Sequence, residues 1–503
     1  MDAQPRPPYR NPVIPGFYPD PSVCRFGPDY LLVNSSFGYF PGVPLFESPD
    51  LIHWNQIGHV LTREIHLPLE GGNVSSGGIY APTIRAHRDR LYVITTNVTA
   101  GGNFIVTAPA PQGPWSDPVW IGESIAPGID PSLFFDEDGS VYFTGAHLGI
   151  YQFQIDIQTG KPLGDLRRLW SGTGGQCPEG PHLFRRGEFY YLTIAEGGTE
   201  YGHMQTIARS RGPWGPWEPC PHNPILTHRS RSSEFQALGH SDFVQGPDGL
   251  WWLVFHVNRP CGYPRFHVCG RETCLAPVEW IDDWPVVNGG ELIRADMGSP
   301  SESRTFKDDF NGSSLSLNWA HLRNPEPDNY RLGERSSYLG LVPSTAQLSG
   351  AERPTFVGTR QTSHETTASA MFDFSELEEG DEAGLTIFQN ETHHYEIAAT
   401  RQQGSLELIV RRRIGDLNAI VARVPAAPPR LVLGIEASPE LYRFVYQVPG
   451  DGRVDLASGA ARYLGTETAG MFTGCLFGLY AVAASERKRP GVWIDWYTGK
   501  SVT

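Results

Sequence analysis

The chain has 503 residues, which exceeds the usual length of a single domain, and hydrophobic residues make up 40% of it against 19% charged residues. This composition gives ample apolar surface for cores and too little charge for disorder. The formal net charge of −15 argues against nucleic acids and anionic membranes as partners, because clustered Lys and Arg hold both. No apolar run approaches the roughly 18 residues of a spanning helix. We expect a globular protein of two domains, with no nucleic-acid or membrane partner.

The N-terminal sequence MDAQPRPPYRNP has no basic segment followed by an apolar stretch and a small-residue cleavage site. Seven cysteines, an odd number in a long chain, favour reduced thiols over a disulfide framework. We therefore expect a cytoplasmic protein, or a secreted one if a leader has been removed.

The first 290 residues contain a repeat of strand, turn and aromatic strand. Gly and Pro, at 56 and 43 residues, separate short runs rich in Val, Ile, Tyr and Trp, so the chain is predicted to be all-β. The repeat recurs five times, at spacings of 61, 49, 50 and 60 residues, which favours a five-bladed β-propeller of four-stranded blades. A β-sandwich with coincidental spacing is the alternative. The shared apolar residues are Val23, Ile84, Leu133, Leu183 and Phe243.

Residues that open the innermost strand of each blade should converge on the propeller axis, because equivalent positions face the same way. Those residues are Asp20, Asp130, Glu179 and His240, and Glu179 lies one step earlier relative to its Pro than the two Asp residues do. Taken singly, each Asp-Pro-Ser is typical of a turn, since Asp suits turns and Pro fixes φ. Turns do not require three acids at one blade position, where the carboxylates would repel one another.

Glycoside hydrolysis and metal binding are the two chemistries that best use such a cluster. In hydrolysis, one carboxyl is protonated and donates to the leaving oxygen while another is ionised, and proximity of like charges pushes their pKa values apart. The two long spacings indicate insertions, at residues 61–79 and 221–238, whose loops would wall a pocket. The neighbouring aromatic residues Phe37, Phe40 and Tyr80 suit sugar stacking, although ordinary blade packing explains each of them equally well.

The chain resembles glycoside hydrolase family 43 over nearly its whole length. Within that family it is most similar to two-domain β-xylosidases and α-L-arabinofuranosidases, in which a five-bladed propeller is followed by a C-terminal β-sandwich and which are often oligomers. The segments that carry the resemblance include NPVIPGFYPDPSVCR, SSFGYFPGVPLFESPDLIHW, GGIYAPTIR, GIDPSLFFDEDG, CPEGPHLFRRGEFYYLTIAEGGT, GHSDFVQGPDGLWWLVF and GRETCLAPVEW.

The resemblance implies roles for the three carboxylates and for two residues of the sugar pocket. Asp20 corresponds to the general base that activates water, Glu179 to the general acid, and Asp130 to the carboxylate that tunes and orients Glu179, with inversion as the outcome. Arg271 of the GRET motif corresponds to an arginine that binds sugar hydroxyls, a role suited to a planar guanidinium; a surface ion pair with a neighbouring Glu (position 272 or 279) is the alternative. Phe37 corresponds to an aromatic wall.

Three further positions bear on metal binding and on the preferred sugar. His240 corresponds to a histidine that in some relatives contacts a divalent ion through water, most often calcium, although calcium prefers oxygen ligands and a lone His is more often a core residue. The chemistry itself requires no cofactor. Gly38 and Tyr80 stand where relatives often carry Glu and Trp, which predicts a wider or less apolar pocket mouth.

The repeat ends in a Gly- and Ser-rich stretch, which predicts a domain boundary near residue 300, with a catalytic propeller at 1–300 and a second domain at 301–503. Alternating strands in the second domain predict a lectin-like, concanavalin-like sandwich. Alone it would be interpreted as a carbohydrate-binding module. In relatives it packs on the propeller and lends an aromatic residue to the pocket mouth, for which Phe472 is the candidate; a core strand position is the alternative.

The sequence thus predicts an exo-acting inverting glycoside hydrolase that releases terminal β-D-xylose from xylo-oligosaccharides, with α-L-arabinofuranosidase activity as well. One alternative is an enzyme that mainly removes arabinose branches from arabinoxylan. Another is a sugar-binding protein without turnover, since propellers also serve as lectins. The expected partners are xylo- or arabinoxylo-oligosaccharides and, in a homo-oligomer, further copies of the chain.

Overall fold

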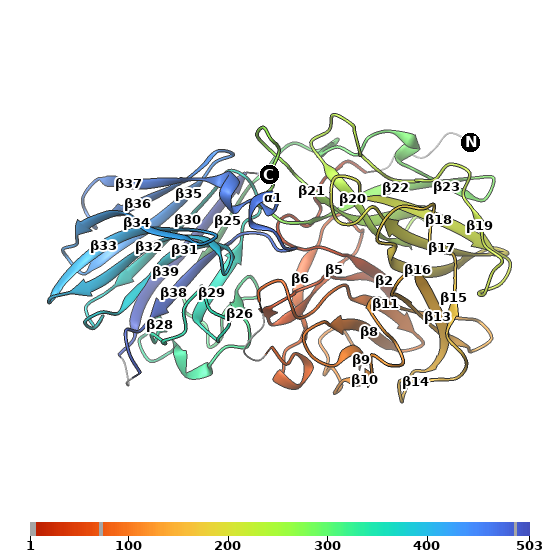
Figure 1. The fold of residues 1–503 in the computed structure, drawn as a ribbon, viewed down its shortest axis with the longest axis horizontal. Coiled ribbons are helices and arrows are strands. Elements are labelled where there is room, and N and C mark those ends of the chain that lie inside the picture. Colours follow the sequence, from red (N-terminus) through yellow and green to blue (C-terminus); the bar gives the residue numbers. More distant parts are fainter. Residues whose placement is uncertain (1–6, 70–73, 487–489, 503) are drawn as a thin grey trace.

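The computed structural model describes residues 7–69, 74–486 and 490–502, and it places a propeller beside a sandwich. In Figure 1 the propeller runs from red to green, and the sandwich, in blue and blue-green, lies against one side of it. Strands dominate both bodies, and the one α-helix within these ranges, α1 (Thr466–Ala469), has four residues. The all-β class and the order of the two folds are confirmed. No helix in the described ranges is long and apolar enough to cross a membrane.

Five sheets arranged in chain order form the propeller, and the five predicted repeats each supply one of them. Every blade has at least four antiparallel strands, and the first strand of each contains the repeated apolar residue. The first blade comprises β2 (Ser22–Phe26), β3 (Asp29–Val33), β5 (Gly42–Ser48) and β6 (Asn55–Leu61), and the second comprises β7 (Thr83–His87), β8 (Arg90–Asn97), β9 (Gly102–Ala108) and β10 (Val119–Ile121). The third comprises β11 (Ile129–Phe135), β12 (Val141–Ala146), β13 (Ile150–Asp156), β14 (Lys161–Pro162) and β15 (Arg167–Arg168). The fourth comprises β16 (Glu179–Arg186), β17 (Phe189–Glu196), β18 (Met204–Ser210) and β19 (Glu218–Pro219), and the fifth comprises β20 (Gln236–Gln245), β21 (Trp251–Asn258), β22 (Glu272–Ile281) and β23 (Trp284–Val287).

The ring closes where the last blade packs on the first. Leu32 of the first blade lies in one buried cluster with Trp252 and Val254 of the fifth. Full burial of a side chain such as Leu32 stabilises the fold by about 1.5–3 kcal/mol. The N-terminal strand β1 (Tyr9–Arg10) strengthens this seam by pairing with β24 (Asp296–Met297). The ring therefore holds the innermost strands of all five blades in fixed positions around one axis.

Two packed eight-stranded sheets form the sandwich, which is the predicted architecture. The first comprises β27 (Tyr330–Leu332), β28 (Leu339–Leu341), β39 (Val492–Val502), β30 (Thr366–Asp373), β35 (Arg430–Ala437), β36 (Leu441–Gln447) and β37 (Arg453–Ala460), with β25 (Ser303–Asp308) also pairing with β39. The second comprises β34 (Leu417–Pro425), β33 (Ser405–Ile414), β32 (His393–Gln402), β31 (Glu382–Asn390), β38 (Leu476–Val482), β29 (Thr355–Arg360), β26 (Ala320–Leu322) and β4 (Tyr39–Phe40). Short 3-10 helices are Glu64–His66, Asn288–Gly290, Pro327–Asn329 and Ala461–Leu464.

The second sheet of the sandwich is buried on both faces in its centre. Leu385 of β31 faces the sandwich core, whereas Phe388 of the same strand joins a cluster that contains Phe37 of the propeller. Strand β31 is therefore buried along almost its whole length, and its sequence AGLTIF is apolar rather than alternating. The sandwich thus packs on the propeller through a core-like interface.

One strand of that sheet comes from the propeller. Strand β4 pairs with β26, so Phe40 stands opposite His321. The sequence suggested Phe40 as an aromatic residue of the sugar pocket. Phe40 lies in this sheet instead and does not line the pocket. Nearby, the fully buried Arg323 donates to Glu391, which also accepts from the Ser75 backbone at 2.8 Å. The two bodies share a sheet, and Ser75 of the propeller donates to a carboxylate that is ion-paired within the sandwich.

Candidate active site

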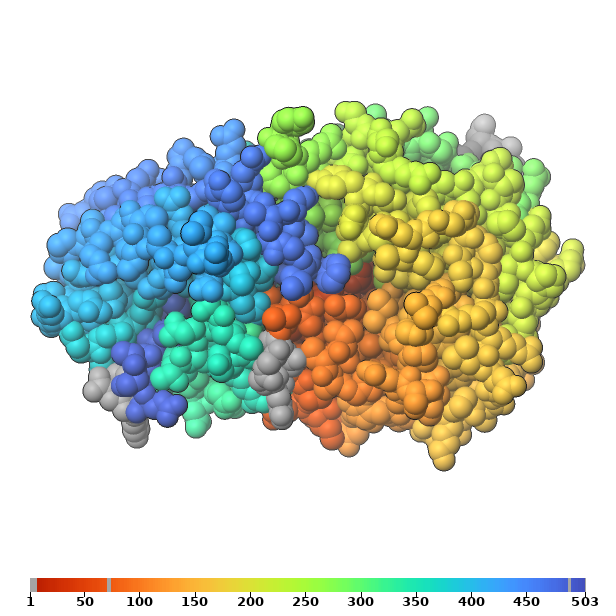
Figure 2. Space-filling view, in the orientation of Figure 1, coloured from red at the N-terminus to blue at the C-terminus, as the bar shows by residue number. Residues whose placement is uncertain are grey.

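Eight of the residues that the sequence predicts for the site lie around one small cavity at the propeller axis, whereas Phe40 does not. The cavity has a volume of about 70 Å³, and Figure 2 shows a hollow near the centre of this face of the propeller, with blue atoms of the sandwich at its rim. Three residues that the sequence did not indicate also line it: Ala81, Ile129 and Thr199. The predicted eight are Asp20, Phe37, Tyr80, Asp130, Glu179, His240, Arg271 and Phe472.

The innermost strands enter the cavity through a shared backbone turn. Asp20, Asp130 and His240 have φ of 54°, 56° and 51°, in the left-handed region that few non-glycine residues adopt. In the fourth blade Gly180 has this conformation, with φ 56°, so Glu179 precedes the equivalent position by one residue. A Cβ on Gly180 would lie 3.1 Å from the His240 ring. Glycine therefore lets Glu179 and His240 approach the axis together.

Asp20 is buried and held by donors on both oxygens. Arg271 and Ser35 donate to Oδ1 and Oδ2 respectively, the latter at 2.5 Å, and His256 Nδ1 lies 3.0 Å from Oδ1. Burial alone would raise the pKa of Asp20. The positive charge of Arg271, with contributions from His240 and His256, outweighs burial and holds the pKa well below its usual range. Asp20 is consequently ionised at every working pH.

Glu179 has the opposite environment. In the described part of the chain, His203 is the only basic side chain within ion-pair distance of its carboxyl group, with Nε2 3.8 Å from Oε1, and burial keeps the pKa of His203 well below its usual value. Burial raises the pKa of Glu179 to about 8, and the charges of Asp130 and Asp20 act in the same direction. Asp130 lies close enough to accept from the Gly180 backbone N–H at 3.0 Å. Glu179 is therefore protonated at neutral pH beside an ionised Asp20.

Three histidine rings lie close together near Asp20. The ring centroid of His256 is 5.7 Å from that of His240 and 5.1 Å from that of His203, and burial lowers the pKa of His256 to about 4. Calcium prefers oxygen ligands, whereas the nearest carboxylate, Asp20, is already occupied by Arg271 and Ser35. Within the described ranges no three His, Cys, Asp or Glu side chains are grouped to hold a metal ion. These side chains do not fit direct calcium coordination.

Arg271 lies between the carboxylates and the aromatic wall. Its guanidinium stands 5.6 Å from the Phe37 ring and 5.9 Å from the Phe472 ring, and it is only 7% exposed. The alternative of a surface ion pair with Glu272 or Glu279 is wrong, because Arg271 is buried and pairs with Asp20, while Glu272 pairs with Arg259. The side chain of Arg271 thus points into the cavity rather than to the surface.

The aromatic wall combines residues from both bodies. Tyr80 lies 5.0 Å from Phe37 and 6.2 Å from Phe472 between ring centroids. Phe472 follows α1 in the sandwich and is 39% exposed, so it is not a core strand position. Glu467 of α1 fixes this segment by accepting from His267 and from the Tyr201 hydroxyl at 2.8 Å. The sandwich thereby supplies one side of the pocket mouth.

Two expectations about the mouth are corrected. The described parts of insertions 61–79 and 221–238 do not line the cavity; residues 70–73 of the first lie outside the described residues. The first insertion packs on the sandwich instead, where Leu69 and Ser75 bond to Asn324 and Glu391. Gly38 does not widen the mouth either, because the Ser75 backbone fills the space of its missing side chain, within 2.9 Å of an ideal Cβ.

The sequence did not indicate the supports of Asp20. Ser35 follows β3 in the segment NSSF, and His256 lies on β21 between apolar residues, where a single histidine is indistinguishable from a core residue. Thr199 lies in a Gly-rich loop without a repeat partner. These side chains lie near the axis only because the ring of blades brings their strands and loops there, which no local sequence pattern indicates.

A pocket that holds one carboxylate ionised and another protonated, under an aromatic wall, has the parts of an enzyme that hydrolyses glycosidic bonds. Comparison with known proteins agrees. Residues 9–285 match the family model of glycosyl hydrolases family 43, and residues 307–500 match the model of the β-xylosidase C-terminal concanavalin A-like domain. The chain belongs to glycosyl hydrolases family 43 and is a glycoside hydrolase.

Several characterised relatives extend over nearly the whole chain. A non-reducing end α-L-arabinofuranosidase of Bacteroides ovatus is 38% identical over 97% of this chain and 94% of its own length. A xylosidase/arabinosidase of Butyrivibrio fibrisolvens is also 38% identical, over 94% of this chain and 95% of its own. The solved structure of a Bacteroides ovatus xyloglucan-locus family 43 protein superposes with a TM-score of 0.92 at 37% identity, covering 98% of this chain and 99% of that one.

Proposed function

We propose that the protein is an exo-acting, inverting hydrolase that releases terminal β-D-xylose from xylo-oligosaccharides and also cleaves terminal α-L-arabinofuranose. One observation carries this proposal: a single cavity contains Asp20, which is ionised, and Glu179, whose pKa is raised to about 8. The names of the two relatives at 38% identity, an arabinofuranosidase and a xylosidase/arabinosidase, support the choice of pentose substrates.

In the proposed reaction Glu179 protonates the glycosidic oxygen while Asp20 removes a proton from a water molecule. That water attacks the anomeric carbon from the face opposite the leaving group, so the configuration inverts. An inverting pair is spaced by about 6.5–9.5 Å to leave room for the water. Both protons pass between substrate, water and carboxyl groups, so these side chains supply the acid and the base without a cofactor.

Asp130 and Arg271 have supporting roles in this proposal. Asp130 accepts from the N–H of Gly180, which fixes the peptide that follows Glu179, and its charge contributes to the raised pKa of Glu179. Arg271 keeps Asp20 ionised and lies beside the aromatic wall, where its remaining N–H groups can bind sugar hydroxyls. The exo mode is supported by the name of the Bacteroides ovatus relative, a non-reducing end α-L-arabinofuranosidase.

The alternative of a purely sugar-binding protein does not explain Glu179. A binding pocket gains nothing from a carboxyl group held protonated beside an ionised one, and burying both costs stability. Chromogenic β-D-xyloside and α-L-arabinofuranoside test this directly. Turnover abolished by Asp20→Asn supports the enzyme, whereas tight binding without turnover in the parent protein refutes it.

The second candidate function is that arabinose release is the main activity, and the named arabinofuranosidase relative favours it. Fit in an apolar pocket separates two pentoses by only about 1–3 kcal/mol, so the preference can invert with one side chain. The measurement is kcat/KM on xylobiose and on arabinose-substituted xylo-oligosaccharides. Faster release of arabinose with little cleavage of xylobiose would reject the first choice.

Three further expectations belong to this proposal. A calcium ion near the axis would reach His240 only through water, and a calcium titration of chelator-treated protein, followed by thermal unfolding, tests it. Homo-oligomer formation is tested by light scattering coupled to size-exclusion chromatography. Action in the cytoplasm on short oligosaccharides is tested by fractionation of cells that express the protein.

A further inference from the structure

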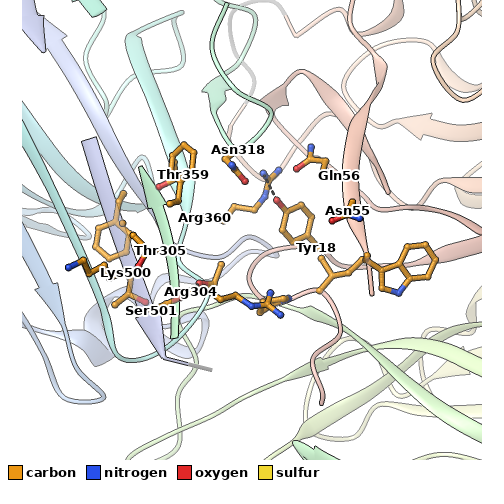
Figure 3. A pocket seen from close by; sticks show the side chains of 18 of the residues that line it. Tyr18, Asn55, Gln56, Arg304, Thr305, Asn318, Thr359, Arg360, Lys500 and Ser501 are labelled. Atoms are coloured by element: carbon orange, nitrogen blue, oxygen red, sulfur yellow. Dashed lines mark hydrogen bonds between the residues drawn. The ribbon is translucent and has the colours of Figure 1, made fainter. Parts of the chain in front are cut away.

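A second, larger cavity lies between the propeller and the sandwich, and it shares no lining residue with the catalytic cavity. Its volume of about 380 Å³ lies in the range of small-molecule sites, which occur preferentially at domain interfaces. Figure 3 shows side chains from β6 and the N-terminal segment of the propeller facing others from β25, β29 and β39 of the sandwich. The ring closure and the shared sheet fix both walls.

The charge of this cavity is opposite to that of the whole protein. Among the residues that the structure describes, three cations line it, namely Arg304, Arg360 and Lys500, and no Asp or Glu does. None of the three forms an ion pair with a carboxylate in the described part of the chain. The chain as a whole has 55 acidic and 40 basic residues, so a purely cationic lining is not expected from composition. The cavity is therefore an electropositive site in an acidic protein.

Arg360 is the strongest evidence, because it is buried and only 7% exposed. Its Nε donates to the Phe17 carbonyl at 2.9 Å and its Nη1 to the Tyr18 hydroxyl at 3.4 Å, and its guanidinium lies 4.4 Å from the Tyr18 ring centroid. The dashed contact to Tyr18 is visible in Figure 3. These partners are neutral. A buried charge without a counter-charge costs stability, which an anionic ligand would offset.

The other lining groups suit a saccharide. Trp54 is partly exposed and provides an aromatic face, as sugar rings require for stacking. Amide groups of Asn55, Gln56 and Asn318 surround the opening and can exchange hydrogen bonds with hydroxyls. We propose that this cavity binds an anionic sugar, whose carboxylate or phosphate group pairs with Arg360 and Arg304 while its ring lies against Trp54, with Lys500 adding positive charge at the sandwich side of the lining.

The site can be tested in the full-length protein without measuring catalysis. The probes are D-glucuronate and D-glucose 6-phosphate, with D-glucose, acetate and inorganic phosphate as controls, titrated calorimetrically at low ionic strength. At least one sugar anion should bind about tenfold more tightly than D-glucose. It should also bind about tenfold more tightly than its simple anion, which is acetate for D-glucuronate and inorganic phosphate for D-glucose 6-phosphate. Which one binds distinguishes a carboxylate from a phosphate ligand. Equal affinity for D-glucose, equal affinity for the simple anion, or no binding of either sugar anion overturns the proposal.

Two variants locate the binding. Arg304→Ser/Lys500→Ser removes two exposed charges at the opening and should weaken the sugar anion about fivefold or more. Lys161→Ser removes an exposed charge of β14, outside the cavity, and should leave the affinity unchanged. In the parent protein the sugar anion should also protect Lys500 from acetylation, but not Lys161 or Lys307. Equal weakening in both variants, or an unprotected Lys500, would show that the anion binds elsewhere.

Discussion

Replacing Asp130 by Asn tests whether the protein sets the protonation state of Glu179 by charge. Burial is the largest cause of the raised pKa of Glu179, the charge of Asp130 is the second and that of Asp20 the third. An Asn side chain removes the charge but keeps an oxygen that can accept from the Gly180 N–H. The substitution therefore changes electrostatics more than geometry.

The magnitude follows from the ordinary pKa of 4.5 and the raised value of about 8. Because burial accounts for the largest part of this rise, removing the Asp130 charge should lower the pKa of Glu179 by about one unit, equivalent to ~1.4 kcal/mol. A general acid acts only while protonated, so its pKa sets the alkaline limb of the rate profile. That limb should move from near pH 8 down to near pH 7.

The assay is the pH profile of kcat/KM on xylobiose, whose poor leaving group needs the acid. The matched control is Asp138→Asn, which removes a charge from an exposed turn of the same blade and should leave the limb in place. The acidic limb should not move into the neutral range in either variant, because Arg271 keeps the pKa of Asp20 low. An alkaline limb that stays near pH 8 in Asp130→Asn would refute charge tuning.

The remaining predictions concern the acid, the base and the wall. Glu179→Gln should cut kcat on xylobiose by about 10²–10⁴-fold but much less on nitrophenyl xyloside, whose good leaving group needs little help from an acid. Equal losses on the two substrates would contradict the role of Glu179 as the acid. Arg271→Lys, which lacks the planar fork, should raise the pKa of Asp20 and move the acidic limb of kcat/KM upward; an unmoved limb would contradict the assigned cause. Phe472→Ala should raise KM with an unfolding temperature within about 2 °C of the parent, because this side chain is 39% exposed; unchanged kinetics would exclude it from the pocket.

The fold was predictable because the repeated sequence pattern consists of residues that pack within and between blades. Apolar strand residues such as Leu133 recur at blade spacing, and the following aromatic strands pack blade on blade. The axis carboxylates were predictable for the same reason, since symmetry carries Asp20 and Asp130 to one end of the channel. The offset of Glu179 is explained by Gly180, which takes the left-handed position that Asp20, Asp130 and His240 occupy in three of the other blades.

The contacts between the two bodies were not predictable from the repeat. Phe40 lies beside Phe37 in a propeller loop, yet it becomes the end strand of a sandwich sheet because β26 offers it a free edge. Gly38 suggested an open mouth when only the missing side chain was considered, whereas the Ser75 backbone occupies that space. Such effects depend on contacts between segments that are distant in the sequence, which local sequence patterns do not predict.

The sandwich has an electrostatic consequence for the propeller in addition to completing its wall. Burial is the leading cause of the raised pKa of Glu179, and Phe472 of the sandwich is one of the residues that line the cavity around it. Burial also acts on Asp20, but there the positive charge of Arg271 outweighs it. Burial in one pocket therefore acts unequally on the two carboxyl groups: it favours the protonated form of the acid and leaves the base ionised. The second domain helps to create the difference between acid and base on which hydrolysis depends.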